Sequence, residues 1–256
     1  MTKAGILALT LILATVPAPF ALAQMAGLDM AAPKMTQATM TRADVEASLA
    51  KATLEMPADF TLVSLNGLDL SGLDFRGATL RSAYLNGTNL SGAKLDGAVL
   101  DQAWALKANF SGASLKKASL FQAQMMDAVF DGADLSGARL TADFSRASML
   151  GTNFEGADFS ADMRNQSMGM MRGVLNSAKL QGARFDKADL SRAQAKFADF
   201  RGASLVGSDL SKMEAQGANF TGASVSGADF AGMMVQSAEL ADMRGEPKNR
   251  DKVKLR

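Results

Sequence analysis

The sequence predicts an all-β chain that winds into a solenoid of short straight sides joined by corners. Two observations predict this fold: a large apolar residue recurs at every fifth position, and a small residue usually stands two positions before it. The stretch FRGATLRSAYLNGTNLSGAKLDGAVL, residues 75–100, shows both features. Its large apolar residues are Phe75, Leu80, Leu85, Leu90, Leu95 and Leu100.

Neither regular helix nor regular strand accommodates this five-residue period. Positions five apart differ by about 140° around a helix, so the apolar residues would be scattered over its surface. In a strand they would point alternately to opposite faces. The same position can face inward in each repeat only if the backbone turns a corner once per repeat, which predicts a solenoid.

The repeats resemble those of the pentapeptide-repeat family, as in ADFS at 157–160, ADLSR at 188–192 and ADF at 228–230. The resemblance covers roughly 180 residues. It implies a right-handed quadrilateral β-helix over residues 60–243, with the central apolar residue and the small residue both inside. Four repeats form a coil, so we expect about nine coils and a rod about 40 Å long.

Departures from the pattern mark local features. The central position is small at three places where a large residue is expected: Ala105, Ala195 and Ala215. Met213 stands two positions before Ala215, which predicts a local exchange of large and small residues within that layer. The register runs from Leu65 to Leu140, loses one residue before Phe144 and returns at Leu175. The irregular segment 160–173 forms either a protruding loop or a degenerate coil; as a loop, it would carry specific contacts.

The N-terminus has the three parts of a secretory signal peptide, residues 1–23: Lys3, an apolar run from Ala4 to Val16, and the small-residue site ALA at 21–23. The alternative is an uncleaved anchor, but the run is shorter than the roughly 20 residues that span a bilayer. We expect a mature protein that begins at Gln24, is periplasmic or secreted, and has no stable membrane insertion.

Both ends of an open β-helix need covering. We predict a linker over residues 24–40 and an N-terminal capping helix over 41–56, with Thr41 as N-cap, Asp44 three positions later, and one apolar face. That face comprises Val45, Leu49, Ala52 and Met56. The polar basic tail, 244–256, offers no apolar face and is expected to be solvated. The resemblance implies a possible homodimer through the C-terminal coil.

Composition excludes several function classes. The chain has no Cys and no His, which removes thiolate nucleophiles, imidazole bases and the usual zinc ligands. Its 27 basic and 26 acidic side chains provide no general attraction to nucleic acid. We therefore expect no enzyme activity, no cofactor and no nucleic-acid partner. The resemblance suggests a DNA mimic that binds topoisomerases, but this near-neutral chain with a signal peptide disfavours it.

Two groups of residues raise the possibility of metal binding. The acidic series Asp189, Asp209 and Asp229 recurs once per coil, and turn hydrogen bonds with local neutralisation explain it better than a metal site. Methionines repeat every five residues from Met25 to Met40 and cluster in the irregular segment as Met163, Met168, Met170 and Met171. Thioethers bind Cu(I) or Ag(I), although methionine also fills irregular gaps in a core.

The sequence thus favours a non-enzymatic, exported protein whose rigid repeat surface binds an unknown protein partner or has a structural role. Methionine-based Cu(I) or Ag(I) binding is the alternative. The candidate contact residues lie at an outward position of the repeat and in the irregular segment: Trp104, Arg164, Asn165, Gln166 and Arg172.

Overall fold

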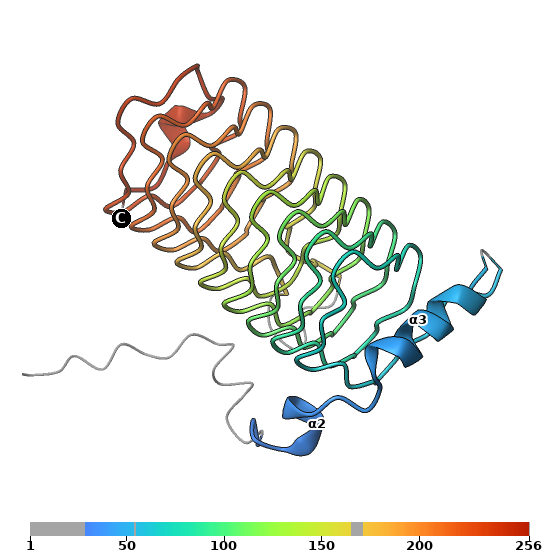
Figure 1. Cartoon of the computed structure of the whole chain (residues 1–256). Helices are drawn as coiled ribbons and strands as arrows, with labels where there is room; N and C mark the ends of the chain where they lie inside the picture. Colours follow the sequence, from blue (N-terminus) through green and yellow to red (C-terminus); the bar gives the residue numbers. More distant parts are fainter. Residues whose placement is uncertain (1–28, 54, 165–170, 256) are drawn as a thin grey trace, which may run out of the picture. The chain divides into compact units, whose positions relative to one another are not determined.

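The computed structural model describes residues 29–53, 55–164 and 171–255. The chain divides into two compact units, Met1–Met30 and Ala31–Arg256. Because only Asp29 and Met30 of the first unit are described, the predicted signal peptide lies outside the described residues. The second unit is a stack of coils with helices α2 (Pro33–Thr36) and α3 (Arg42–Lys51) before it and the short 3-10 helix η2 (Arg250–Lys252) near its end (Figure 1).

Parallel bridges join each coil to the next in four ladders. A bridging residue recurs at every fifth position, and in regular coils it pairs with the residue twenty positions later, as Asp59 does with Thr79. The backbone N–H of Leu80 donates to the carbonyl of Val99 at 2.7 Å, and the N–H of Val99 donates to the carbonyl of Ala78 at 2.9 Å. The predicted β-helix is therefore present, with one bridging residue in place of a longer strand on each side.

Each corner is a tight turn closed by a backbone hydrogen bond. The N–H of the small residue donates to the carbonyl of the central residue three positions earlier, as from Ala83 to Leu80 at 3.1 Å. The residue before the small one has positive φ, for example +70° at Gly72 and +53° at Ser82. The third residue of a type II turn needs this backbone, which glycine adopts most readily.

The central residues fill the interior of the coil. Leu80, Leu100 and Leu120 have no exposed surface, which confirms their predicted direction. The rings of Phe110 and Phe130 stack with centroids 4.7 Å apart and an interplanar angle of 3°. This distance matches the spacing of neighbouring strands, because side chains on successive rungs inherit the backbone repeat. Burial of each such side chain contributes about 1.5–3 kcal/mol, and the contribution recurs in every coil.

Small central residues do not open the core. Ala105, Ala195 and Ala215 are all fully buried, and so is Met213, which lies two positions before Ala215. Met213 thus occupies the usual small position beside Ala215, which confirms the predicted exchange of large and small residues within that layer. No such exchange occurs at Ala105 and Ala195, because alanine also stands two positions before each of them.

The missing residue before Phe144 shortens one corner. The N–H of Ala142 donates to the carbonyl of Leu140, only two positions earlier, at 2.8 Å. Gln124 accordingly pairs with Asp143, nineteen positions later. The tighter corner absorbs the deletion, and the ladder continues.

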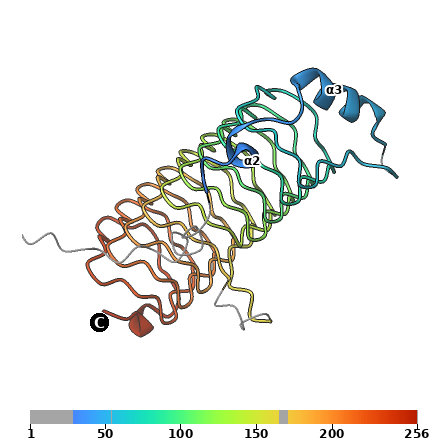
Figure 2. The ribbon, with the colours of Figure 1, turned by 90° about the horizontal axis from the view of Figure 1, so that it is seen from below.

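Segment 160–173 is an insertion into a continuous coil and not a degenerate coil. Asp143 pairs with Val174, thirty-one positions later, which is eleven residues more than the regular spacing of twenty. At the base of the insertion, the N–H of Asp162 donates to the carbonyl of Met171 at 2.7 Å, and the N–H of Gly173 donates to the carbonyl of Phe159 at 2.8 Å. The described ends of the segment leave the stack in Figure 2.

A buried carboxyl group lies next to the shortened corner. Asp143 is only 7% exposed, and its Oδ1 accepts a 2.8 Å hydrogen bond from the N–H of Ser145. Burial raises the pKa of Asp143, and the bond from Ser145 and the charge of Arg146 only partly oppose this. Ionisation of Asp143 therefore disfavours the folded state.

Helix α3 is shorter than predicted. Thr41 caps it, and Thr41 and Asp44 form a reciprocal capping box, as expected. The helix ends at Lys51 because Ala52 adopts an extended backbone, so the prediction that it continues to Met56 is wrong. Val45 is buried as expected, whereas Met56 is 71% exposed because it lies beyond the helix and off its apolar face.

The predicted linker packs against the first coils over its described part. It contains α2, whose Met35 is only 4% exposed. The side chain of Asn86 donates to the carbonyl of Met35 at 3.0 Å, and that of Asn66 donates to the carbonyl of Lys34 at 3.0 Å. The linker prediction did not include these contacts, in which polar side chains of two coils hold the backbone of Lys34 and Met35.

The same segment supplies donors to the outer edge of the first coil. Within the stack, carbonyls on this side accept N–H groups from the preceding coil. At the first coil, the N–H of Thr39 donates to the carbonyl of Ser64 at 2.8 Å. The guanidinium of Arg42 donates to the carbonyls of Asp69 at 2.9 Å and Ser71 at 3.3 Å. These groups replace the donors of a missing coil.

The basic tail is part of the coil, contrary to the prediction of a solvated end. Arg244 pairs with Ser224, Lys248 with Asp229, and Lys254 with Met234. Val253 packs partly against the core. The tail lacks an apolar pattern because it joins the ladders through backbone groups, which any residue type supplies.

We expect Arg42→Ala to lower the free energy of unfolding by about 1 kcal/mol, because two edge carbonyls lose a charged donor in a partly exposed position. Arg81→Ala is the control, since Arg81 is exposed and only forms a 3.7 Å ion pair with Asp101. Urea unfolding followed by circular dichroism measures both. Equal effects of the two substitutions would contradict the role of Arg42.

Asp143→Asn should raise the melting temperature at pH 7 and have little effect near pH 3. The folded-state pKa of Asp143 is raised, so the folded state loses stability as pH rises from the unfolded pKa, about 3.9, through the folded value. Asp229→Asn is the opposite control. Bonds from the Asn249 side chain and the Ala231 N–H lower the pKa of Asp229, so it contributes stability at pH 7 that is lost in acid. A lower melting temperature of Asp143→Asn at pH 7 would refute the assignment.

Candidate interaction surfaces

One ladder carries both Trp104 and the junction where segment 160–173 rejoins the coil. Trp104 is half-buried, with Tyr84 on the preceding rung. We call this series the Trp104 ladder. It consists of Ser64, Tyr84, Trp104, Gln124, Asp143, Val174, Gln194, Glu214, Met234 and Lys254. Only two rungs separate Trp104 from Val174, so the fold brings two candidates that are far apart in sequence to the same side of the coil.

Arg172 is held at the base of the insertion by an acidic residue of a later coil. Its guanidinium forms a 2.7 Å ion pair with Glu214 and donates to the carbonyl of Arg192 at 3.3 Å. Lys196 also contacts Glu214, at 3.0 Å. Burial alone would raise the pKa of Glu214, but the bonds from Arg172 and Lys196 outweigh it and lower the pKa. Arg172 thus fixes the insertion to the coil, a role that the sequence did not reveal.

The other candidates in the insertion are described only in part. The side chain of Arg164 is exposed, and its N–H donates to Asp162 Oδ1 at 2.9 Å. Met163 is 47% exposed, and the amide of Gln122 contacts the sulfur of Met171. The remaining candidates lie outside the described residues: Asn165, Gln166, Met168 and Met170. Binding of Cu(I) or Ag(I) by this methionine cluster therefore stays a prediction.

The turn hydrogen bonds predicted for the acidic series are present, whereas Asp189 and Asp209 form no ion pair with a nearby cation among the described residues. Oδ1 of Asp189 and of Asp209 each accepts the N–H two residues later, at 2.8 Å. Oδ1 of Asp229 accepts the N–H of Ala231 at 2.9 Å and the amide of Asn249 at 2.8 Å. Within the described ranges, no group of three or more acidic side chains could hold a metal ion.

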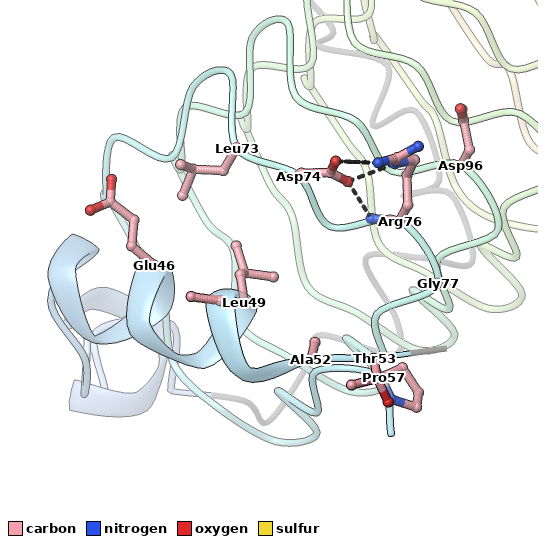
Figure 3. A pocket seen from close by; sticks show the side chains of 11 residues that line it. Glu46, Leu49, Ala52, Thr53, Pro57, Leu73, Asp74, Arg76, Gly77 and Asp96 are labelled. Carbon is pink, nitrogen blue, oxygen red and sulfur yellow. Dashed lines mark hydrogen bonds and ion pairs between the residues drawn. The ribbon is translucent and has the colours of Figure 1, made fainter. Parts of the chain in front are cut away.

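An open groove of about 850 Å³ lies between α3 and the first coils. Leu49 of α3 and Ala52, the residue after its end, line one side, and Leu73 lines the other (Figure 3). Asp74 and Arg76 stand at its edge and bind each other through bonds of 2.6–3.1 Å. The hydrogen bond from Arg76 lowers the pKa of Asp74. Because this charge pair is internally satisfied, the groove offers mainly apolar contact.

The sequence contains a signal for this groove. At the inward position two before the central residue, most coils have alanine, but the first coil has Val63, Leu68 and Leu73. All three are only partly buried and pack at the margin of the core. Large residues at small positions therefore mark the coil that contacts a non-repeat element, a departure that the search for a five-residue period did not use.

Comparison with known proteins agrees with the repeat analysis. The profile of pentapeptide repeats matches in eight copies, over residues 58–97, 93–130, 108–142, 123–160, 174–205 and 193–232. No curated protein matches the sequence.

Two examples represent the solved structures that are similar to this chain. One is HetL, a pentapeptide repeat protein involved in heterocyst differentiation regulation in the cyanobacterium Nostoc sp. strain PCC 7120, with 22% identity, 81% of this chain and 94% of that chain covered, and a TM-score of 0.37. The other is QnrB1, a plasmid-mediated fluoroquinolone resistance protein, which is 18% identical. The match covers 73% of this chain and 95% of QnrB1, with a TM-score of 0.40. Since the repeat profile matches more than half of its residues, the chain belongs to the pentapeptide-repeat family.

Proposed function

We propose that this protein is a non-enzymatic, exported scaffold that binds a protein partner through the Trp104 ladder. The observation that carries the proposal is the position of Trp104 and Val174 on one ladder, with two rungs between them. A tryptophan beside an inserted segment is a typical binding anchor, because it offers a large contact area with few rotatable bonds.

A continuous core supports the rigidity of this surface. The described central residues from Phe60 to Val235 are buried, and each rung is bonded to the next. A surface that is already ordered loses little conformational entropy on binding, so more of the contact energy appears as affinity. We also infer that the coil is right-handed and quadrilateral, since each regular turn of twenty residues has four bridges with a corner between successive bridges.

We infer that α3 and the segment before it act as an N-terminal cap. The support is the set of donors from Thr39 and Arg42 to the first coil, together with the burial of Val45. Covering an open edge prevents it from pairing with another chain. A homodimer through the C-terminal coil stays a prediction, to be tested by light scattering.

Export is the second part of the proposal, and its support is the order of charged, apolar and small residues in 1–23. No helix within the described ranges has the length and apolar character that a bilayer crossing requires. The balanced charge of the repeats disfavours the alternative of a DNA mimic, which needs an acidic exterior.

Expression in a Gram-negative bacterium should give mature protein in the periplasmic fraction with Gln24 as its first residue. Ala23→Leu is the matched variant, because a bulky residue at the cleavage site should block processing. N-terminal sequencing and fractionation measure both outcomes. Unprocessed protein that remains in the cytoplasm would contradict export. Binding through the Trp104 ladder would still be testable with the purified protein.

Affinity capture from the extracytoplasmic fraction should recover a specific partner, and Trp104→Ala should weaken it at least tenfold. Leu150→Ala is the control, since Leu150 is 40% exposed on a corner away from this ladder.

Deletion of residues 162–172 with Ala161→Gly tests the insertion. It restores the five-residue spacing from Asp158 to Val174 and supplies a residue suited to positive φ. Undiminished capture by both altered proteins would exclude the Trp104 ladder.

A further inference from the structure

One corner of the coil carries cations on successive rungs in its C-terminal half. The positive-φ residue of this corner is Arg192 in one coil and Lys212 in the next, with φ of +59° and +58°. The following rungs have Gly232 and then, in the last coil, Lys252. Together with Lys254 on the Trp104 ladder, these residues line an open groove of about 500 Å³, the C-terminal groove, whose floor includes Met234.

The other corners of the described coils avoid this arrangement. One corner places Lys107, Asp127 and Arg146 on successive rungs, so the charges alternate. There, Arg146 forms a 2.7 Å ion pair with Asp127. Another corner has Lys117 and Lys187, with glycine on the rungs between them. Like charges about 4.8 Å apart repel, so the corner of Arg192 and Lys212 is the exception that requires an explanation.

No described carboxylate neutralises these cations by an ion pair. Arg192, Lys212, Lys252 and Lys254 form none within 4.0 Å among the described residues, and Lys252 donates to the neutral side chain of Asn249 at 2.9 Å. The groove also contains Glu214, but Arg172 and Lys196 already occupy its two oxygens. Arg192, Lys212 and Lys254 therefore face one open groove without an ion-pair partner among the described residues, whereas the charge of Lys252 also acts on the carboxylate of Asp229.

We propose that the C-terminal groove binds a ligand that carries two or more phosphate groups. A terminal phosphate group or a phosphate monoester has a charge of about −1.5 to −2 at pH 7, so two of them match four cations. The cations extend over three coil steps, roughly 14 Å. An extended acidic peptide would need four carboxylates on one face, about 6.8 Å apart, and would span roughly 20 Å. Phosphate groups supply the charge within the available length.

The ligand chemistry has two possible sources, a soluble oligophosphate or the headgroups of anionic phospholipids. Both present the same oxygen acceptors to arginine and lysine. Gly232 has no side chain between Lys212 and Lys252, and an added Cβ there would lie 3.5 Å from Cγ of Lys212. Gly232 therefore adds no side chain between the cations, although its φ of +71° is also what the turn requires.

Titration of the purified protein with sodium tripolyphosphate at 150 mM salt, followed by calorimetry, tests the proposal. We expect a dissociation constant in the micromolar range and a weakening of at least tenfold in the double variant Arg192→Gln/Lys212→Gln. Glutamine suits these positions because Gln102 and Gln122 occupy the same corner with φ of +61° and +60°. The melting temperature without ligand should be unchanged or higher, which separates lost binding from lost folding.

The matched control is Lys117→Gln/Lys187→Gln, which removes two positive charges at corner positions of positive φ outside the groove. It should bind tripolyphosphate within twofold of the original protein. Vesicles of phosphatidylglycerol and phosphatidylcholine form a second arm. Vesicle binding that tripolyphosphate displaces supports a lipid headgroup, whereas tripolyphosphate binding without vesicle binding supports a soluble oligophosphate.

Three results would overturn the proposal. One is failure of the original protein to bind either probe at 150 mM salt. Another is equal weakening in both double variants, which would show that only net charge matters. The third is tighter binding of poly-glutamate than of tripolyphosphate, which would assign the groove to an acidic polypeptide.

Discussion

The pairing of each coil with the next is the constraint on which the rest of this structure depends. A rung donates one backbone N–H to the preceding coil and another to the following coil, as Thr79 and Leu80 do, so successive coils must stay in register. The corner between two rungs closes only if one residue adopts positive φ. Together these requirements force the central side chain inward at every fifth residue, and the hydrophobic core follows from the backbone path.

The same constraint determines where the chain can vary. A residue is lost at Ala142 and eleven are gained before Val174, yet the ladders on both sides remain paired. Both changes fall at or beyond corners, where the chain is not bridged to a neighbouring coil. Outward-pointing side chains do not pack in the core, so their residue type can vary. The features particular to this chain therefore lie at rungs such as Trp104, in the insertion and at the corner residues.

The two ends of the stack solve the problem of an open edge differently. At the first coil, a helix and an arginine replace the donors of a missing coil, and large residues such as Leu73 widen the contact. At the last coil, the chain ends in a turn whose lysines and arginines pair through their backbones while their side chains remain outside. The two ends of the stack therefore differ in character: the groove near the first coil is mainly apolar, and the groove near the last coil is lined by cations.

The sequence alone determined the β-helix, the inward residues, the missing residue before Phe144, the capping box at Thr41 and the turn role of the acidic series. These features are local or periodic, so the spacing of residue types is sufficient to predict them. It did not reveal the end of α3 at Lys51 or the pairing of the basic tail, because these depend on backbone contacts that any side chain permits. Nor did it reveal the packing of residues 31–40, which depends on Asn66 and Asn86 from two different coils. Only the tertiary structure decided that Trp104 and Val174 share a ladder, and that Arg192, Lys212 and Lys252 share a groove with Lys254. Those neighbours come from different coils, and an insertion of eleven residues changes which residues become neighbours without altering the five-residue pattern from which the fold is predicted.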